Sequence, residues 1–99
     1  MDYLNENYNK KITLEHLSEE FFVSSAAILY NFKKYTNCSP IDFLLNVRLN
    51  NAKKLLTGTK LSVAEISEKC GFSSANYFGV IFKKKEGLSP ANYRRYKRT

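Results

Sequence analysis

The feature that most constrains this 99-residue chain is a pattern that occurs in it twice. Residues 17–40 and residues 66–90 share, in the same order, Ser-Glu, Ser-Ser-Ala, Phe-Lys-Lys and Ser-Pro. The offset between the copies is 49 residues at the start of the match and 50 at its end. This difference predicts one extra residue near the start of the second Ala-to-Phe stretch. A repeat of this length indicates two copies of one small supersecondary unit.

Helix breakers and apolar residues at helical spacing predict seven helices and no β-hairpin. The expected helices cover residues 2–8, a segment capped by Thr13, residues 25–36, residues 40–56, a segment capped by Ser62, a segment from Ser73 or Ser74 to about residue 86, and residues 90–96. The expected inward side chains include Ile28, Phe32, Tyr35, Ile41, Phe78 and Phe82. The fold class predicted from this pattern is all-α.

Each copy of the repeat consists of a helix, a three-residue turn and a second helix. Ser18 and Ser67 lie near the centres of the first helices, where a steep crossing of two helices requires a small side chain. This arrangement is typical of a helix-turn-helix, in which the second helix enters the major groove of DNA. We therefore expect a single domain with a first lobe at 1–39, a linker helix at 40–57 and a second lobe at 58–99.

Charge is distributed unevenly along the chain, whose formal net charge is +7. Residues 1–30 carry five acidic residues and two Lys, whereas residues 31–99 carry four acidic residues and 14 Lys or Arg. A basic surface of this kind favours a polyanionic partner. No segment approaches the roughly 20 apolar residues of a membrane span, and the start of the chain lacks the features of a signal peptide. We expect a cytoplasmic protein with two free thiols, Cys38 and Cys70.

Many spaced residues carry a resemblance to one known family. In the second half they are Glu65, Ile66, Gly71, Phe72, Ser73, Tyr77, Phe78, Phe82, Lys83, Lys84, Gly87, Ser89, Pro90, Tyr93 and Arg94. In the middle and first half they are Arg48, Ala52, Leu55, Leu56, Leu14, Leu17, Ser24, Ile28, Phe32, Lys33, Lys34 and Pro40. These residues resemble the DNA-binding domain of the AraC/XylS family of bacterial transcription regulators. The resemblance implies two helix-turn-helix lobes rigidly joined by the helix 40–56, with two recognition helices in successive major-groove segments.

Family members read bases from the first turns of each recognition helix, which gives two candidate sets in this sequence. The first reading face is Ser25, Ala26, Leu29 and Tyr30, and the second reading face is Ala75, Asn76, Gly79 and Val80. Relatives often have Arg or Gln at the positions of Tyr30 and Val80. Asn76 is the one side chain here that is able to bond an adenine edge in two places. We therefore expect modest direct readout, a preference for A·T pairs and a reliance on DNA shape.

Phosphate contacts are expected from serines at helix N-termini and from basic side chains. The candidates are Ser24, Lys33, Lys34, Ser73, Ser74, Lys83, Lys84 and Arg94, the last within a basic tail that also contains Arg95, Lys97 and Arg98. Arg48 is expected to face an acidic partner or a phosphate. Phe22 departs from the family, because relatives favour Gly there, and this predicts a local difference in the first turn.

The sequence predicts a sequence-specific double-stranded DNA-binding module that regulates transcription by touching or blocking RNA polymerase. The family usually joins this domain to an N-terminal sensing or dimerising domain. The chain is therefore expected to be either a fragment of a longer regulator, which we favour, or one of the short stand-alone members. One alternative is a helical protein-interaction module whose Lys residues serve solubility. Another is a DNA-repair transferase that uses Cys38 or Cys70. We expect no enzyme activity, cofactor or metal, and no role for the single histidine, His16.

Overall fold

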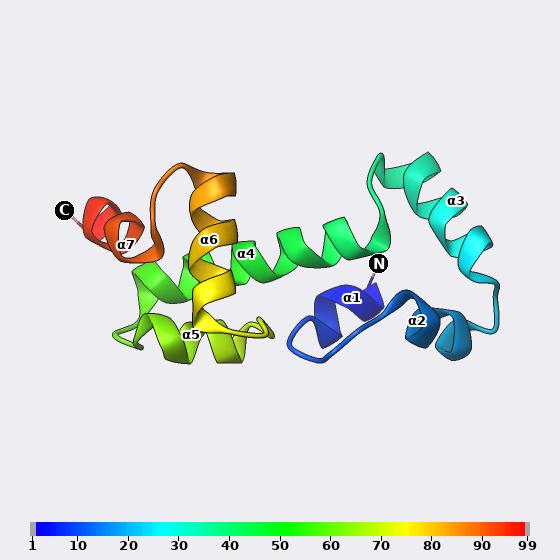
Figure 1. Ribbon diagram of the computed structural model, residues 1–99, viewed down its shortest axis with the longest axis horizontal. Coiled ribbons are helices and arrows are strands. Elements are labelled where there is room, and N and C mark those ends of the chain that lie inside the picture. The colour runs from blue at the N-terminus through cyan, green and yellow to red at the C-terminus, as the bar shows by residue number, and fades with distance from the viewer. Residues whose placement is uncertain (1, 99) are drawn as a thin grey trace. The chain divides into compact units, whose positions relative to one another are not determined.

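The structure is a computed structural model that describes residues 2–98, with the side chains of residues 2 and 98 outside the description. Within this range it contains seven α-helices and no strand (Figure 1). They are α1 (Asp2–Asn7), α2 (Leu14–Phe21), α3 (Ser25–Thr36), α4 (Pro40–Gly58), α5 (Val63–Lys69), α6 (Ala75–Glu86) and α7 (Pro90–Arg98). The predicted all-α class is confirmed. The side chain of Arg98, predicted to belong to the basic tail, lies outside the described residues.

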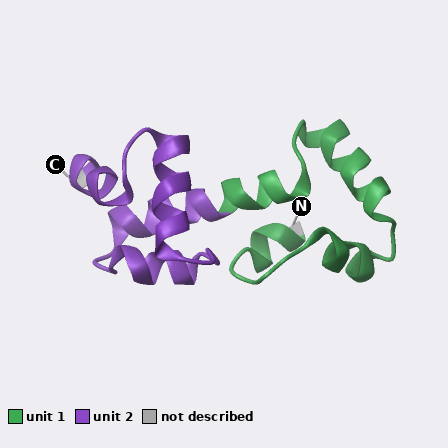
Figure 2. Cartoon of the chain, in the orientation of Figure 1, with its two compact units in different colours: residues 1–47 green, residues 48–99 purple. Residues whose placement is uncertain are grey.

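The chain forms two compact units, residues 1–47 and residues 48–99 (Figure 2). The first contains α1, the pair α2 and α3, and the start of α4, while the second contains the rest of α4, the pair α5 and α6, and α7. Packing therefore divides the chain within α4, whereas the expected lobes ended at 39 and began again at 58. Those expected boundaries stay a prediction.

In each copy of the repeat the second helix, α3 or α6, is capped at its N-terminus by a serine hydroxyl. Ser24 Oγ accepts a hydrogen bond from the Ala27 N–H at 3.1 Å, and Ser74 Oγ accepts one from the Tyr77 N–H at 3.0 Å. Both helices have 12 residues, and their caps are 50 positions apart. The extra residue of the second copy therefore lies in the turn before Ser74, and its predicted place inside the Ala-to-Phe stretch was wrong. An added residue costs less in a turn than in a helix, where it would rotate every later side chain.

The two turns close with the same backbone hydrogen bond. The Val23 N–H donates to the Ser18 carbonyl at 3.3 Å, and the Phe72 N–H donates to the Ser67 carbonyl at 3.0 Å. In both turns the preceding residue is left-handed, at φ 55° for Phe22 and 85° for Gly71. Phe22 and Gly71 therefore have φ in the same region, and the same hydrogen bond follows each of them. The local difference predicted at Phe22 is not seen in either feature. Phe22 adopts the conformation that favours glycine, with its side chain 94% exposed.

Replacing Phe22 with Gly is expected to stabilise the protein. The left-handed region costs an L-residue roughly 1–2 kcal/mol, and part of this gain is offset by the greater backbone entropy of Gly in the unfolded chain. We expect a net gain of about 1 kcal/mol, which corresponds to a rise in Tm of about 4–8 °C. Thermal unfolding followed by circular dichroism measures this. Phe22→Ala is the control, because it removes the ring and keeps the strained Cβ, and an equal gain in both variants would show that φ is not the cause.

The core of the first unit is aliphatic at its centre and consists of Leu4, Ile12, Leu17, Ile28 and Leu44. Phe32 packs against it in an edge contact with Phe43, at a centroid separation of 5.8 Å. Two residues expected inward are exposed, Tyr35 at 73% and Ile41 at 46%. Tyr35 lies in the last turn of α3 and Ile41 in the first turn of α4. Tyr35 therefore lies beyond the turn of Phe32, whereas Ile41 lies between the fully buried Pro40 and the packed Phe43 and is on the side of α4 away from the core.

The core of the second unit is built around stacked aromatic rings. Phe78 and Phe82 are fully buried, as predicted. Ring centroids lie 4.7 Å apart for Phe72 and Phe78, 5.5 Å for Phe78 and Phe82, and 5.3 Å for Phe82 and Tyr93. The small side chain of Ser67 is also buried, and its hydroxyl donates to the Ser74 carbonyl at 3.1 Å. This bond ties α5 to the start of α6 and fixes where the second reading face begins.

Candidate nucleic-acid interface

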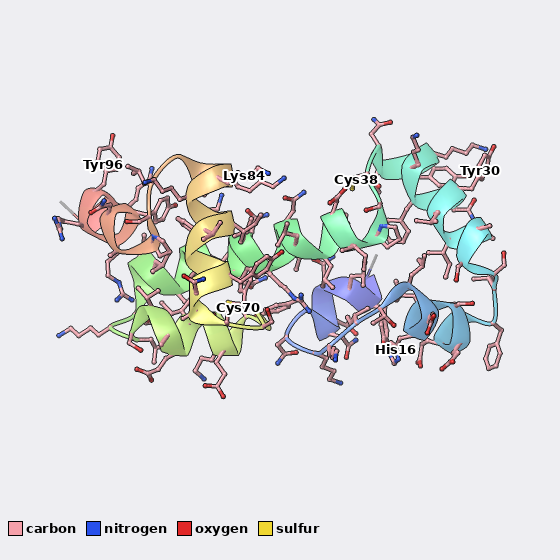
Figure 3. All side chains as sticks on the ribbon, viewed as in Figure 1. His16, Tyr30, Cys38, Cys70, Lys84 and Tyr96 are labelled. Carbon is pink, nitrogen blue, oxygen red and sulfur yellow. The ribbon has the colours of Figure 1, made fainter. Side chains whose placement is uncertain are left out.

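The two reading faces lie on the exposed sides of α3 and α6. On α3, Ala26, Leu29 and Tyr30 are exposed, whereas Ser25 is half-buried. Figure 3 shows Tyr30 projecting from the outer side of α3. Because an α-helix turns about 100° per residue, these three exposed residues share one side of the helix. The structure therefore brings the first reading face together, with Ser25 at its edge.

The second reading face has the same layout on α6 but smaller side chains. Ala75, Asn76 and Val80 are exposed, and Gly79 is half-buried in the middle of the helix. Asn76 is the only polar side chain among the four, and within residues 2–98 its carboxamide has no hydrogen-bond partner. Its donor and acceptor are therefore available to a base edge.

The predicted lysines extend both reading faces by one turn. Lys33 and Lys83 follow Leu29 and Gly79 by four residues, and this spacing places them on the same side of each helix. Both are exposed, as are Lys34 and Lys84, which lie at the flank of each face. Lys34 Nζ is 6.0 Å from the centroid of the Tyr30 ring and 5.5 Å from that of Tyr35. Lys33 and Lys83 are thus the best-placed phosphate candidates.

The three serine candidates lie at the N-termini of α3 and α6. Ser24 and Ser74 are the N-caps, and Ser73 is an exposed residue of the second turn. The first N–H groups of a helix have no partner within it, and they carry the positive end of the helix dipole. Each reading face therefore begins at a group of donors suited to a phosphate.

Arg94 has a role that the sequence did not indicate. Its Nε donates to the Leu56 carbonyl at 2.9 Å, and a terminal nitrogen donates to the Thr59 carbonyl at 3.4 Å. These carbonyls lie at the end of α4, where the last C=O groups have no partner within the helix. The acceptors are 38 and 35 residues away in sequence, so no local pattern could reveal the contact. The structure therefore gives Arg94 a structural role, and its predicted phosphate contact stays a prediction.

Two further polar residues lie away from the reading faces. His16 Nε2 is within hydrogen-bond distance, 2.7 Å, of the hydroxyl of Tyr3 on α1. Arg48 is half-buried on α4, and burial lowers the pKa of its guanidinium, while Tyr77 and Cys70 act electrostatically to raise it.

Among residues 2–98, no three His, Cys, Asp or Glu side chains form a group that could hold a metal ion. In the same range, no helix is both long and apolar enough to span a membrane.

Cys70 has the opposite properties to a reactive thiol. It is fully buried, and burial raises its pKa to about 11, against the opposing influence of Arg48. The thiolate is the nucleophile, so a raised pKa suppresses reactivity. We expect Cys70 in a Cys38→Ser variant to react with a thiol reagent at pH 8 far more slowly than Cys38 in a Cys70→Ala variant. Equal rates would contradict the burial of Cys70.

The same shift has a consequence for stability in alkali. In the unfolded chain the thiol titrates near its usual pKa of about 8.5. Because the folded state favours the neutral thiol, its contribution to stability is complete below about pH 8.5 and is lost as pH rises towards 11. Urea unfolding at pH 8 and pH 10.5 measures this, with Cys70→Ala as the control that should show a smaller decrease.

Comparison with known proteins gives a family model and curated relatives. A helix-turn-helix domain model matches residues 17–96. The chain is 44% identical over 93 residues to the uncharacterized HTH-type transcriptional regulator YdiP of Escherichia coli K12, covering 94% of the chain and 31% of YdiP. It is 33% identical over 93 residues to the bifunctional transcriptional activator/DNA repair enzyme AdaA of Bacillus subtilis 168, covering 94% of the chain and 44% of AdaA. The chain thus spans less than half the length of these relatives.

Solved structures give the same result. The C-terminal domain of AraT, a response regulator from Geobacillus stearothermophilus, superposes with a TM-score of 0.93 at 33% identity, covering 96% of this chain and 79% of that one. The DNA-binding domain of AdpA, a global transcriptional factor in complex with a target DNA, also gives 0.93, at 28% identity, covering 98% and 87%.

Proposed function

Because the chain belongs to the AraC/XylS family of helix-turn-helix transcription regulators, we propose that it binds double-stranded DNA in a sequence-specific manner and so regulates transcription. The chain is a DNA-binding domain and not an enzyme. The observation that carries the proposal is that α3 and α6 each present an exposed reading face followed by an exposed lysine one turn later. A recognition helix in the major groove presents side chains to the base edges and cations to the phosphates, and both kinds of residue are present here.

The two reading faces differ at all four corresponding positions. Leu29 and Tyr30 of α3 correspond to Gly79 and Val80 of α6, because the N-caps are 50 residues apart. Two different faces recognise two different half-sites, so the DNA site is asymmetric rather than palindromic. In the mode that the family resemblance implies, α3 and α6 occupy successive major-groove segments of one DNA face.

Further parts of the proposal concern the longer protein to which such a domain belongs. The curated relatives are two to three times the length of this chain. We propose an N-terminal sensing or dimerising domain, a cytoplasmic location, and regulation by touching or blocking RNA polymerase. Each follows from the family, and each needs the full-length protein for its test.

The first experiment is a selection from a random DNA pool, followed by titration of the selected duplex at several KCl concentrations. If six to eight phosphates are neutralised, the logarithm of the binding constant should fall against the logarithm of salt with a slope of about −5 to −7. A helical protein-interaction module would give neither an enriched sequence nor this slope.

The second experiment separates base reading from phosphate binding within α6. Asn76→Ala is expected to weaken binding to the selected duplex by about 10–100-fold, the loss of one bidentate base contact, with little change on unrelated DNA. Lys83→Gln is the matched control, because it should weaken binding to all duplexes alike and reduce the salt slope by about 1. Uniform weakening by Asn76→Ala would assign that side chain to a phosphate instead.

A further inference from the structure

Gly79 is the residue of α6 for which packing offers no explanation. It lies in the middle of the helix, where Gly destabilises relative to Ala because it loses more backbone entropy on folding. A Cβ added to Gly79 would have no atom within 4 Å, and Gly79 is not among the residues of positive φ. Neither close packing nor backbone conformation therefore requires glycine at this position.

The surroundings of Gly79 indicate what the missing side chain leaves open. Ala75, Asn76 and Lys83 lie one turn away on the same side of α6, and Val80 is adjacent with 62% of its side chain exposed. The equivalent position in α3 is Leu29, which is 41% exposed. The second reading face therefore has a notch directly beside Asn76, whereas the first has a protruding apolar side chain.

We propose that the notch at Gly79 receives the C5-methyl group of a thymine adjacent to the adenine that Asn76 reads. The inference rests on the proposed function. In the major groove an adenine offers the N7 acceptor and N6 donor that match a carboxamide, and thymine offers the methyl group as an apolar protrusion. A bare Cα lets the helix backbone approach closely, and the methyl groups of Ala75 and Val80 make the surrounding surface of α6 apolar.

The notch makes Gly79 a specificity-determining residue that acts through the absence of a side chain. An alanine there would fill the space that the methyl group occupies while making α6 more stable. The second half-site should accordingly contain one thymine whose methyl group contributes to affinity, next to the position at which Asn76→Ala loses its preference.

The test uses the duplex selected by the wild-type chain, with each thymine replaced in turn by deoxyuridine, which lacks only the methyl group. One replacement is expected to weaken binding about four-fold, the effect of burying a single methyl group. Gly79→Ala should bind the thymine duplex at least about four-fold more weakly, and deoxyuridine at that position should then cause no further loss. The Tm of the Gly79→Ala protein should nevertheless rise by a few degrees, which excludes unfolding as the cause.

Leu29→Ala is the control variant, because it alters the equivalent position of α3 and should leave the deoxyuridine effect at this thymine unchanged. The inference is overturned if no thymine shows the effect, or if deoxyuridine weakens binding equally in the wild type and in Gly79→Ala. Failure of the proposed function would be seen earlier and differently, since the wild-type chain would then enrich no sequence from the pool.

Discussion

Replacing Phe78 with Ala is expected to lower the free energy of unfolding of the second unit by about 3–5 kcal/mol. The ring is fully buried and lies between Phe72 at 4.7 Å and Phe82 at 5.5 Å, so its removal leaves a cavity that both neighbours line. Small domains have total stabilities of about 5–15 kcal/mol, so this one change consumes much of the available stability. Urea denaturation followed by circular dichroism measures the loss.

The matched control for this prediction is Phe22→Ala, which deletes the same ring from a residue that is 94% exposed. That variant should differ from the wild type by about 0.5 kcal/mol or less. A small effect of Phe78→Ala, comparable with that of Phe22→Ala, would mean that the aromatic stack does not support the second unit. DNA binding should be lost in Phe78→Ala only to the extent that the unit is unfolded at the temperature of the assay.

Replacing Arg94 with Met should have the second-largest effect, a loss of about 1.5–3 kcal/mol of unfolding free energy. The methionine keeps most of the apolar stem but removes two charge-assisted donors to carbonyls at the end of α4. The Leu56 and Thr59 carbonyls then lose the hydrogen bonds from Arg94, and this link between α7 and the end of α4 is broken. Chemical denaturation of the isolated domain measures this effect.

Arg95→Met provides the control, because Arg95 is the exposed neighbour on the same helix and its change should leave stability within about 0.5 kcal/mol. The two variants also distinguish a structural role from a phosphate contact. Where Arg94→Met is still folded, a salt dependence of DNA binding equal to that of the wild type would show that Arg94 acts structurally alone. A slope reduced by about 1 would show that Arg94 also binds a phosphate.

Local rules predicted much of this fold. Thr13, Ser24 and Ser62 cap helices as expected, because a capping hydroxyl and its N–H are only three residues apart. Gly71 and Gly87 have positive φ where helices end. Phe78 and Phe82 are buried because their spacing of four residues places them on one side of α6. The predicted family and function class are confirmed by the comparisons.

The predictions that failed depended on information that sequence spacing does not contain. Whether Tyr35 and Ile41 are buried depends on which turns and which side of each helix the core covers, which is a property of packing between segments. The structural role of Arg94, which spacing did not indicate, depends on acceptors at the end of a distant helix, and its phosphate contact stays a prediction. At Phe22 the tertiary constraint of the turn prevailed over the intrinsic preference of the residue.

Sequence spacing predicted which residues form the candidate site, but not how the two reading faces differ in shape. Helical spacing is sufficient to place Asn76 and Val80 on one side of α6, and the structure bears out that grouping. The contacts of these residues with bases, and of the lysines and serines with phosphates, stay predictions. The contrast between Leu29 and Gly79 became informative only when the N-caps fixed which positions correspond.

The sharing of α4 between the two units limits how the protein can be dissected. Leu44 belongs to the same hydrophobic cluster as Leu4, Leu17 and Ile28, while Ala52 and Leu56 are buried within residues 48–99. A fragment that ends at residue 39 would lack Leu44 and with it part of the hydrophobic core of the first unit. An engineer who recombines such domains would therefore have to place the junction inside the shared helix, near residues 47 and 48, so that each half keeps its own segment of it.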